Sequence, residues 1–136
     1  MDKERRFGGP RAALVSYWVA TVLVTAELLL GGAWDVLQVT WVRAIIDHLG
    51  YPRYVLVILG SWKLLGAAAL LAPRFPRLKE WAYAGAVFNY TGAIASHLAV
   101  GDGPLAILYP IIQLGLLGAS WSLRPSSRRD RRPAAA

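Results

Sequence analysis

Four long apolar stretches, separated by short polar segments, dominate the chain. They cover residues 12–34, 54–72, 81–100 and 104–123. Each reaches the roughly 18 residues that an α-helix needs to cross the apolar layer of a bilayer. Because backbone amides in lipid must pair within their own segment, all four stretches are predicted to be helical. The pattern therefore predicts an all-α fold, a four-helix transmembrane bundle that leaves no room for a separate soluble domain.

Residues 36–49 show a different pattern, with apolar positions on one helical face and polar positions on the others. The apolar set is Val39, Val42, Ile46 and Leu49, and the polar set is Gln38, Arg43, Asp47 and His48. This segment is too polar to span a membrane, so we expect an amphipathic interfacial helix between the first and second spanning helices. The first spanning helix is predicted to end near Gly31 and Gly32. Gly50 and Pro52 are expected to end the amphipathic helix.

Composition and charge support a membrane location. Hydrophobic residues make up 56% of the chain, and the mean hydropathy is +0.41. The net charge is +7, and its basic residues gather before the first helix, between the second and third, and after the fourth. Such alternation is typical of the positive-inside rule. It predicts a multi-pass protein of the bacterial inner (plasma) membrane with both termini cytoplasmic, and it argues against nucleic-acid binding.

Three regions follow from these patterns. Residues 1–11 are expected to form a cytoplasmic N-terminal segment, residues 12–123 the membrane domain, and residues 124–136 a basic, disordered cytoplasmic tail that contacts anionic lipid headgroups. Three further apolar stretches follow the first one. We therefore expect the first to stay as a signal anchor rather than to be cleaved as a signal peptide.

Five polar side chains lie inside the predicted spans: Glu27, Lys63, Asn89, His97 and Gln113. A lysine at mid-membrane costs roughly 3 kcal/mol on insertion scales, so it needs compensation. At about 1.5 Å per residue, all five fall near the midplane or in the outer half. We expect one polar, ligand-binding cavity that opens outward, with Glu27 as counter-ion of Lys63 and with His48 or Asp35 above His97.

Structural roles compete with that interpretation. Glu27 and Lys63 could form a purely architectural bridge, or Lys63 could extend along the lipid face to the interface. Asn89 and Gln113 could hydrogen-bond between helices, and His97 could be an interfacial residue without chemistry. On the functional side, Glu27 and His97 are the candidate catalytic acid or base, because burial shifts the pKa values of such groups. The chain has no cysteine and two histidines without ligand spacing, so no metal site is expected.

Several short motifs between residues 48 and 102 resemble those of the DoxX-like family of small four-helix membrane proteins. They are LGYP, G-x-x-K-L-L-G, P-R-L-K-E-W-A-Y-A-G and T-G-A…S-H…G-D. The matching positions are Gly50, Tyr51, Pro52, Gly60, Lys63, Gly66, Glu80, Trp81, Gly85, Gly92, Ser96, His97, Gly101 and Asp102. Glu27 and Asp35 do not map onto this pattern. The resemblance implies one of three roles: a subunit of a quinone-linked thiosulfate oxidoreductase, a partner of a membrane redox-defence complex, or a receptor-assembly chaperone.

Together these observations predict an accessory subunit that binds a quinone-like or other lipophilic small molecule, or a membrane redox partner. One alternative is a small membrane enzyme in which Glu27 or His97 transfers a proton and Lys63 stabilises an anion. Another is an assembly factor that presents its helices to other membrane proteins. A homo-oligomer is compatible with each of these functions.

Overall fold

The computed structural model describes residues 9–129, and this part of the chain is helical without any strand. Its elements are α1 (Pro10–Val36), α2 (Thr40–His48), α3 (Tyr54–Leu71), α4 (Pro76–Ala99), α5 (Pro104–Ser122) and the 3-10 turn η1 (Ser126–Arg128). The predicted all-α class is confirmed. The predictions for residues 1–8 and 130–136 lie outside the described residues.

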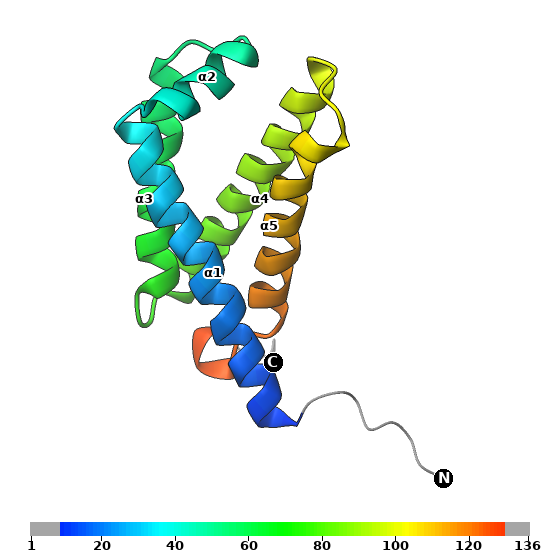
Figure 1. The fold of residues 1–136 in the computed structure, drawn as a ribbon. Helices are drawn as coiled ribbons and strands as arrows, with labels where there is room; N and C mark the ends of the chain where they lie inside the picture. The colour runs from blue at the N-terminus through cyan, green and yellow to red at the C-terminus, as the bar shows by residue number, and fades with distance from the viewer. Residues whose placement is uncertain (1–8, 130–136) are drawn as a thin grey trace, which may run out of the picture.

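The four long helices pack in the cyclic order α1, α3, α4, α5, so each one contacts two neighbours. The contact between α3 and α4 is the most limited of the four. The short helix α2 and the α4–α5 connection lie at one end of the molecule, which we call the outer end (Figure 1). The start of α1, the α3–α4 connection and η1 lie at the opposite, inner end (Figure 1).

Three helices in the described region are long and apolar enough to cross a membrane: α1, α3 and α5. Helix α4 is long, with 24 residues, but it does not reach the same hydropathy. Its sequence carries Lys79 and Glu80 in its first turns and Asn89 and His97 further along. Helices α1, α3 and α5 thus indicate an integral membrane protein.

Two predicted helix boundaries are wrong. Helix α1 does not end at Gly31 and Gly32 but continues to Val36. Gly32 does not end the helix but allows the backbone of α3 to pack closely against α1. The amphipathic helix is shorter than residues 36–49 and begins at Thr40, after a turn in which Gln38 has a φ of 49°. The apolar face of α2 is buried against the start of α3 through Val42, Ile46 and Leu56.

Glycine brings α1 and α3 into backbone contact. A Cβ atom placed on Gly60 would lie 2.6 Å from the Gly32 carbonyl oxygen and 2.8 Å from Asp35 Cβ. A Cβ atom on Gly32 would lie 3.0 Å from the Gly60 carbonyl oxygen. Small residues at helix crossings allow such close approach in membranes. The crossing fixes the depth at which residues on α1 meet residues on α3.

The inner end is held by cations that cap helix carboxyl ends. Lys79 is 1% exposed, and its ammonium donates hydrogen bonds to the carbonyl oxygens of Ala69, at 2.9 Å, and of Ala72, at the end of α3. The Arg128 guanidinium donates to the Leu70 carbonyl oxygen at 3.2 Å. Positive charge at a helix C-terminus is favourable, and these bonds satisfy carbonyls that have no intrahelical partner.

Residues 124–129 belong to the folded structure rather than to a disordered tail. Arg124 is buried, forms an ion pair of 2.6 Å with Glu80 and lies over the ring of Tyr83. Arg128 lies over the ring of Trp18 at 4.8 Å. These contacts join the end of α5 to α4 and α1, because arginine combines ion pairing with stacking on aromatic rings.

We predict that Gly60→Ala destabilises the protein by about 1–3 kcal/mol, since the new methyl group would overlap the α1 backbone. Unfolding in mixed micelles with increasing SDS measures this change. Gly66→Ala on the same helix is the matched control, because its Cβ would meet nothing closer than 4.0 Å. Equal stability of the two variants would contradict the close crossing.

Candidate functional site

Lys63 forms its ion pair with Asp35, at an Nζ–Oδ2 distance of 2.8 Å. Both side chains are largely buried, at 16% and 9% exposure. The pair spans the glycine crossing, and Gly60 lies one helical turn before Lys63. Sequence reasoning named Glu27 as the counter-ion because it ended α1 too early, and this assignment differs from what the structure shows. A helix that continues past Gly32 carries Asp35 to the depth of Lys63.

Glu27 instead faces α4 and α5. The Tyr90 hydroxyl of α4 donates a hydrogen bond to Glu27 Oε2. The Tyr109 hydroxyl of α5 interacts with the Glu27 carboxylate and with the amide of Gln113. Gln113 is 8% exposed, and its Oε1 atom has no hydrogen-bond partner among the described residues. Glu27, Tyr90, Tyr109 and Gln113 are called the Glu27 cluster below.

The Glu27 cluster adjoins the ion pair without merging with it. A Cβ atom on Gly31 would lie 2.9 Å from Glu27 Oε1 and 3.5 Å from Lys63 Nζ. The two charged ends therefore both lie close to this glycine. Glu27 thus lies near the Asp35–Lys63 pair, although its own contacts are with hydroxyl groups of α4 and α5.

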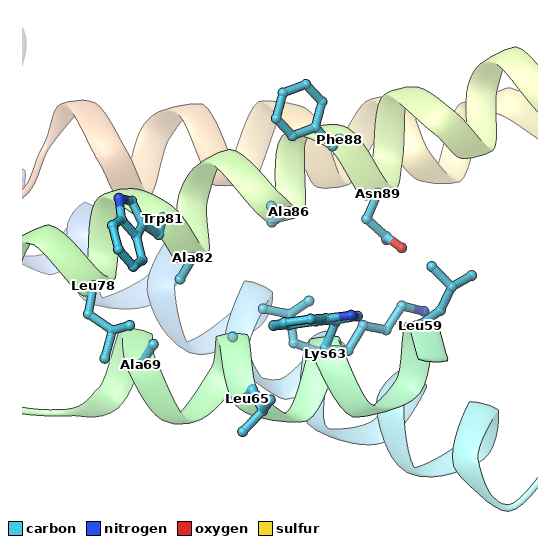
Figure 2. Close-up of a pocket in the computed structure, with 14 residues that line it drawn as sticks. Leu59, Lys63, Leu65, Ala69, Leu78, Trp81, Ala82, Ala86, Phe88 and Asn89 are labelled. Carbon is cyan, nitrogen blue, oxygen red and sulfur yellow. The ribbon is translucent and has the colours of Figure 1, made fainter. Parts of the chain in front are cut away.

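A groove of about 420 Å³ lies between α3 and α4, where helix contact is most limited. It is half open, and its walls are apolar along most of their length (Figure 2). Trp81, Leu78 and Ala69 lie toward one end, whereas Lys63, Asn89 and Leu59 lie toward the other (Figure 2). The groove thus combines a long apolar wall with two hydrogen-bonding groups at one end. Pockets for small lipophilic molecules have this composition and volume.

The predicted single cavity is therefore divided. Lys63 and Asn89 line the α3–α4 groove, whereas Glu27 and Gln113 belong to the Glu27 cluster. His97 lies in neither place, and it is at the outer end of α4. The five residues come from four helices, so hydropathy and depth alone could not assign the side of each helix on which they lie.

At the outer end, one carboxylate joins two histidines. His97 Nδ1 donates to Asp102 Oδ2 at 2.6 Å, and His48 Nε2 donates to Asp102 Oδ1 at 2.8 Å. A carboxylate only accepts hydrogen bonds, so each histidine uses one ring nitrogen as the donor to Asp102. The other ring nitrogen of each histidine remains available for a further interaction. The arrangement ties α2 to the end of α4. The sequence led us to expect His48 or Asp35 beside His97. Asp102 connects His48 to His97, whereas Asp35 pairs with Lys63.

Two glycine turns build this bridge. Gly101 has a φ of +79°, and the Asp102 amide donates to the His97 carbonyl oxygen at 3.0 Å, which is the Schellman pattern at a helix end. Gly50 has the same φ after α2, and the Tyr51 amide donates to the Ile46 carbonyl oxygen at 3.1 Å. The Tyr51 hydroxyl then bonds Ser96 Oγ at 2.9 Å.

The hydrogen bonds from His97 and, to a smaller extent, from His48 hold the pKa of Asp102 below its usual value. Nearby on α2, a hydrogen bond from Arg53 likewise lowers the pKa of Asp47, with an Nη2–Oδ2 distance of 2.8 Å. Both carboxyl groups are therefore ionised at neutral pH. The described residues contain no group of three His, Asp or Glu side chains arranged to hold a metal ion.

Sequence reasoning did not name Tyr90 or Tyr109, and it named Asp35 and Asp102 without the partners that the structure gives them. Asp102 carried a signal, since it follows a glycine just after a histidine-ended helix. Tyr90 and Tyr109 did not, because aromatic residues within apolar stretches are common and their hydroxyl groups find partners by tertiary packing.

Comparison with models of known protein families gives a match. The model of the DoxX-like family matches residues 19–120, which include α2, α3, α4 and most of α1 and α5. Neither a search of curated proteins nor a search of solved structures finds a match.

We predict that Lys63→Met destabilises the protein by roughly 3–5 kcal/mol, because it leaves the buried Asp35 carboxylate without a cation. The double variant Lys63→Met/Asp35→Leu should cost less than the sum of the two single changes, and SDS-induced unfolding measures all three. Glu27→Gln is the control variant, because it leaves the Lys63–Asp35 ion pair unchanged. Additive effects of the two single changes would rule out the pairing.

We predict that the pKa of Asp102 rises toward the ordinary value of an aspartate in His97→Ala, since the larger of its two lowering contacts is lost. Because the pKa is lower in the folded state, Asp102 stabilises the fold above about pH 4, and this stabilisation is lost as the pH falls through the folded value. Carboxyl ¹³C NMR in detergent gives the pKa. A value unchanged in His97→Ala would exclude this contact.

Proposed function

The chain belongs to the DoxX-like family, and we propose that it is an accessory membrane subunit that binds a quinone-like or other lipophilic molecule in the α3–α4 groove. The observation that carries this proposal is the groove itself. Its volume of about 420 Å³ lies within the range of small-molecule sites, and its polar groups gather at one end. A molecule with an apolar tail and a polar head matches that distribution.

The chemistry of the polar end favours a hydrogen-bond acceptor as the head group. The Lys63 ammonium has three donors, and its bond to Asp35 uses one of them. The Asn89 amide adds two donors. A carbonyl oxygen, as in a quinone, fits these donors. A carboxylate head is less suitable, because Asp35 already neutralises the lysine.

In the membrane we propose that all four long helices span and that α2 lies in the outer interface. Helix α4 has 24 residues, or about 36 Å of helix, and packs between α3 and α5. Lys79, Arg124 and Arg128 gather at the inner end, which supports a cytoplasmic location for this end in the bacterial inner membrane. The groove then opens to lipid between α3 and α4, through which a membrane-dissolved ligand or redox partner gains access.

A second function, proton-transfer chemistry, is favoured by one observation. The Asp102 carboxylate holds His97 Nδ1 at 2.6 Å, as an orienting carboxylate holds a catalytic histidine, and leaves His97 Nε2 available as a base. Lipid extracts from cells that contain the wild type or His97→Ala, compared by mass spectrometry, test this function. A product that disappears in the variant would support it over simple binding.

We predict that a short-chain benzoquinone quenches the fluorescence of Trp62 and Trp81 in the wild type, because both line the groove. Gly85→Leu should weaken the quenching at least tenfold, since Gly85 lines the groove and a Cβ atom there would meet nothing within 4 Å. Native mass spectrometry should show the same loss of a bound lipophilic molecule.

Gly92→Leu is the matched control on the same helix. A Cβ at Gly92 would also meet nothing within 4 Å, but Gly92 does not line the groove. Quenching that is equal in the two leucine variants, or bare wild-type protein in the mass spectrum, would contradict the proposed site.

A further inference from the structure

The charges near the α1–α3 crossing do not balance. Three charged side chains lie there: Glu27, Asp35 and Lys63. The one cation is bonded to Asp35 at 2.8 Å, so the described residues leave one carboxylate, that of Glu27, without a cation bonded to it. An uncompensated charge within a membrane is unfavourable and marks a candidate functional site.

The contacts of Glu27 supply hydrogen bonds but no charge. Tyr90 is 2% exposed and donates to Glu27 Oε2, and Tyr109 interacts with the same carboxylate from α5. Both groups are neutral hydroxyls. The Glu27 cluster is therefore fixed in position by three helices, and with Glu27 ionised it carries a net negative charge.

Gln113 adds an independent sign of a missing partner. It is more than nine-tenths buried, and its amide interacts with Tyr109. Within residues 9–129, its Oε1 acceptor has no hydrogen-bond partner. Buried amide oxygens in folded proteins almost always accept a hydrogen bond. The cluster thus offers two kinds of acceptor, a carboxylate and an amide oxygen, and lacks the donor that would satisfy both.

We propose that the Glu27 cluster binds the protonated amine head of a lipophilic molecule. The ammonium group would donate to the Glu27 carboxylate and to Gln113 Oε1, and its charge would neutralise Glu27. Tyr109 is 54% exposed, so an amphiphile dissolved in the bilayer reaches the cluster beside α5. None of the four cluster residues lines the α3–α4 groove, so this site stands or falls independently of the proposed function.

Three amphiphiles of equal chain length test the proposal: dodecylamine, dodecanol and dodecanoate. Binding to the purified protein in a mild zwitterionic detergent is measured at pH 7 by thermal stabilisation and native mass spectrometry. A primary amine carries its proton at this pH. The wild type should bind dodecylamine at least tenfold more tightly than dodecanol, with dodecanoate the weakest.

Glu27→Gln should abolish the preference for the amine, and Gln113→Leu should reduce it several-fold. If Glu27→Gln does not fold, the comparison of Gln113→Leu with the wild type decides. Asn89→Leu, which changes the groove, should keep the amine preference while it weakens benzoquinone binding. Equal affinities of the wild type for the three amphiphiles, or an amine preference that persists in both cluster variants, would overturn the proposal.

Discussion

The backbone contact between Gly32 and Gly60 is the constraint on which the rest of the structure depends. With side chains at these positions, α1 and α3 would have to move apart, because a Cβ on Gly60 would lie 2.6 Å from a carbonyl oxygen. The close approach brings Asp35 to Lys63 and thereby compensates a charge that a single apolar helix could not carry. Packing of small residues thus makes a buried lysine tolerable.

That pairing has consequences for the other polar groups. Because Asp35 neutralises Lys63, the lysine can act as a hydrogen-bond donor at the end of the α3–α4 groove without strong attraction for anions. Glu27 is not the counter-ion of Lys63, and it interacts instead with hydroxyl groups from α4 and α5. One ring of four helices therefore presents two chemically different surfaces, one rich in donors and one rich in acceptors.

The groove lies between α3 and α4, where helix contact is most limited. Hydrogen bonds hold the helices at each end of the molecule. At the inner end, Lys79 and Arg128 bond the last carbonyls of α3. At the outer end, the His48–Asp102–His97 bridge and the Tyr51–Ser96 bond tie α2 and the start of α3 to the end of α4. The glycines of the LGYP and GD motifs, Gly50 and Gly101, serve these bonds by adopting a positive φ.

The sequence by itself determined the helical class, the membrane-spanning character of α1, α3 and α5, and the polar residues at issue, since hydropathy and helical period are local properties of the chain. Tertiary structure decided the partners: Asp35 rather than Glu27 for Lys63, Tyr90 for Glu27, and Asp102 for both histidines. Depth along a helix follows from residue count. The side of the helix that faces a given neighbour depends on how closely backbones approach, and that was set by glycines whose packing no local pattern reveals.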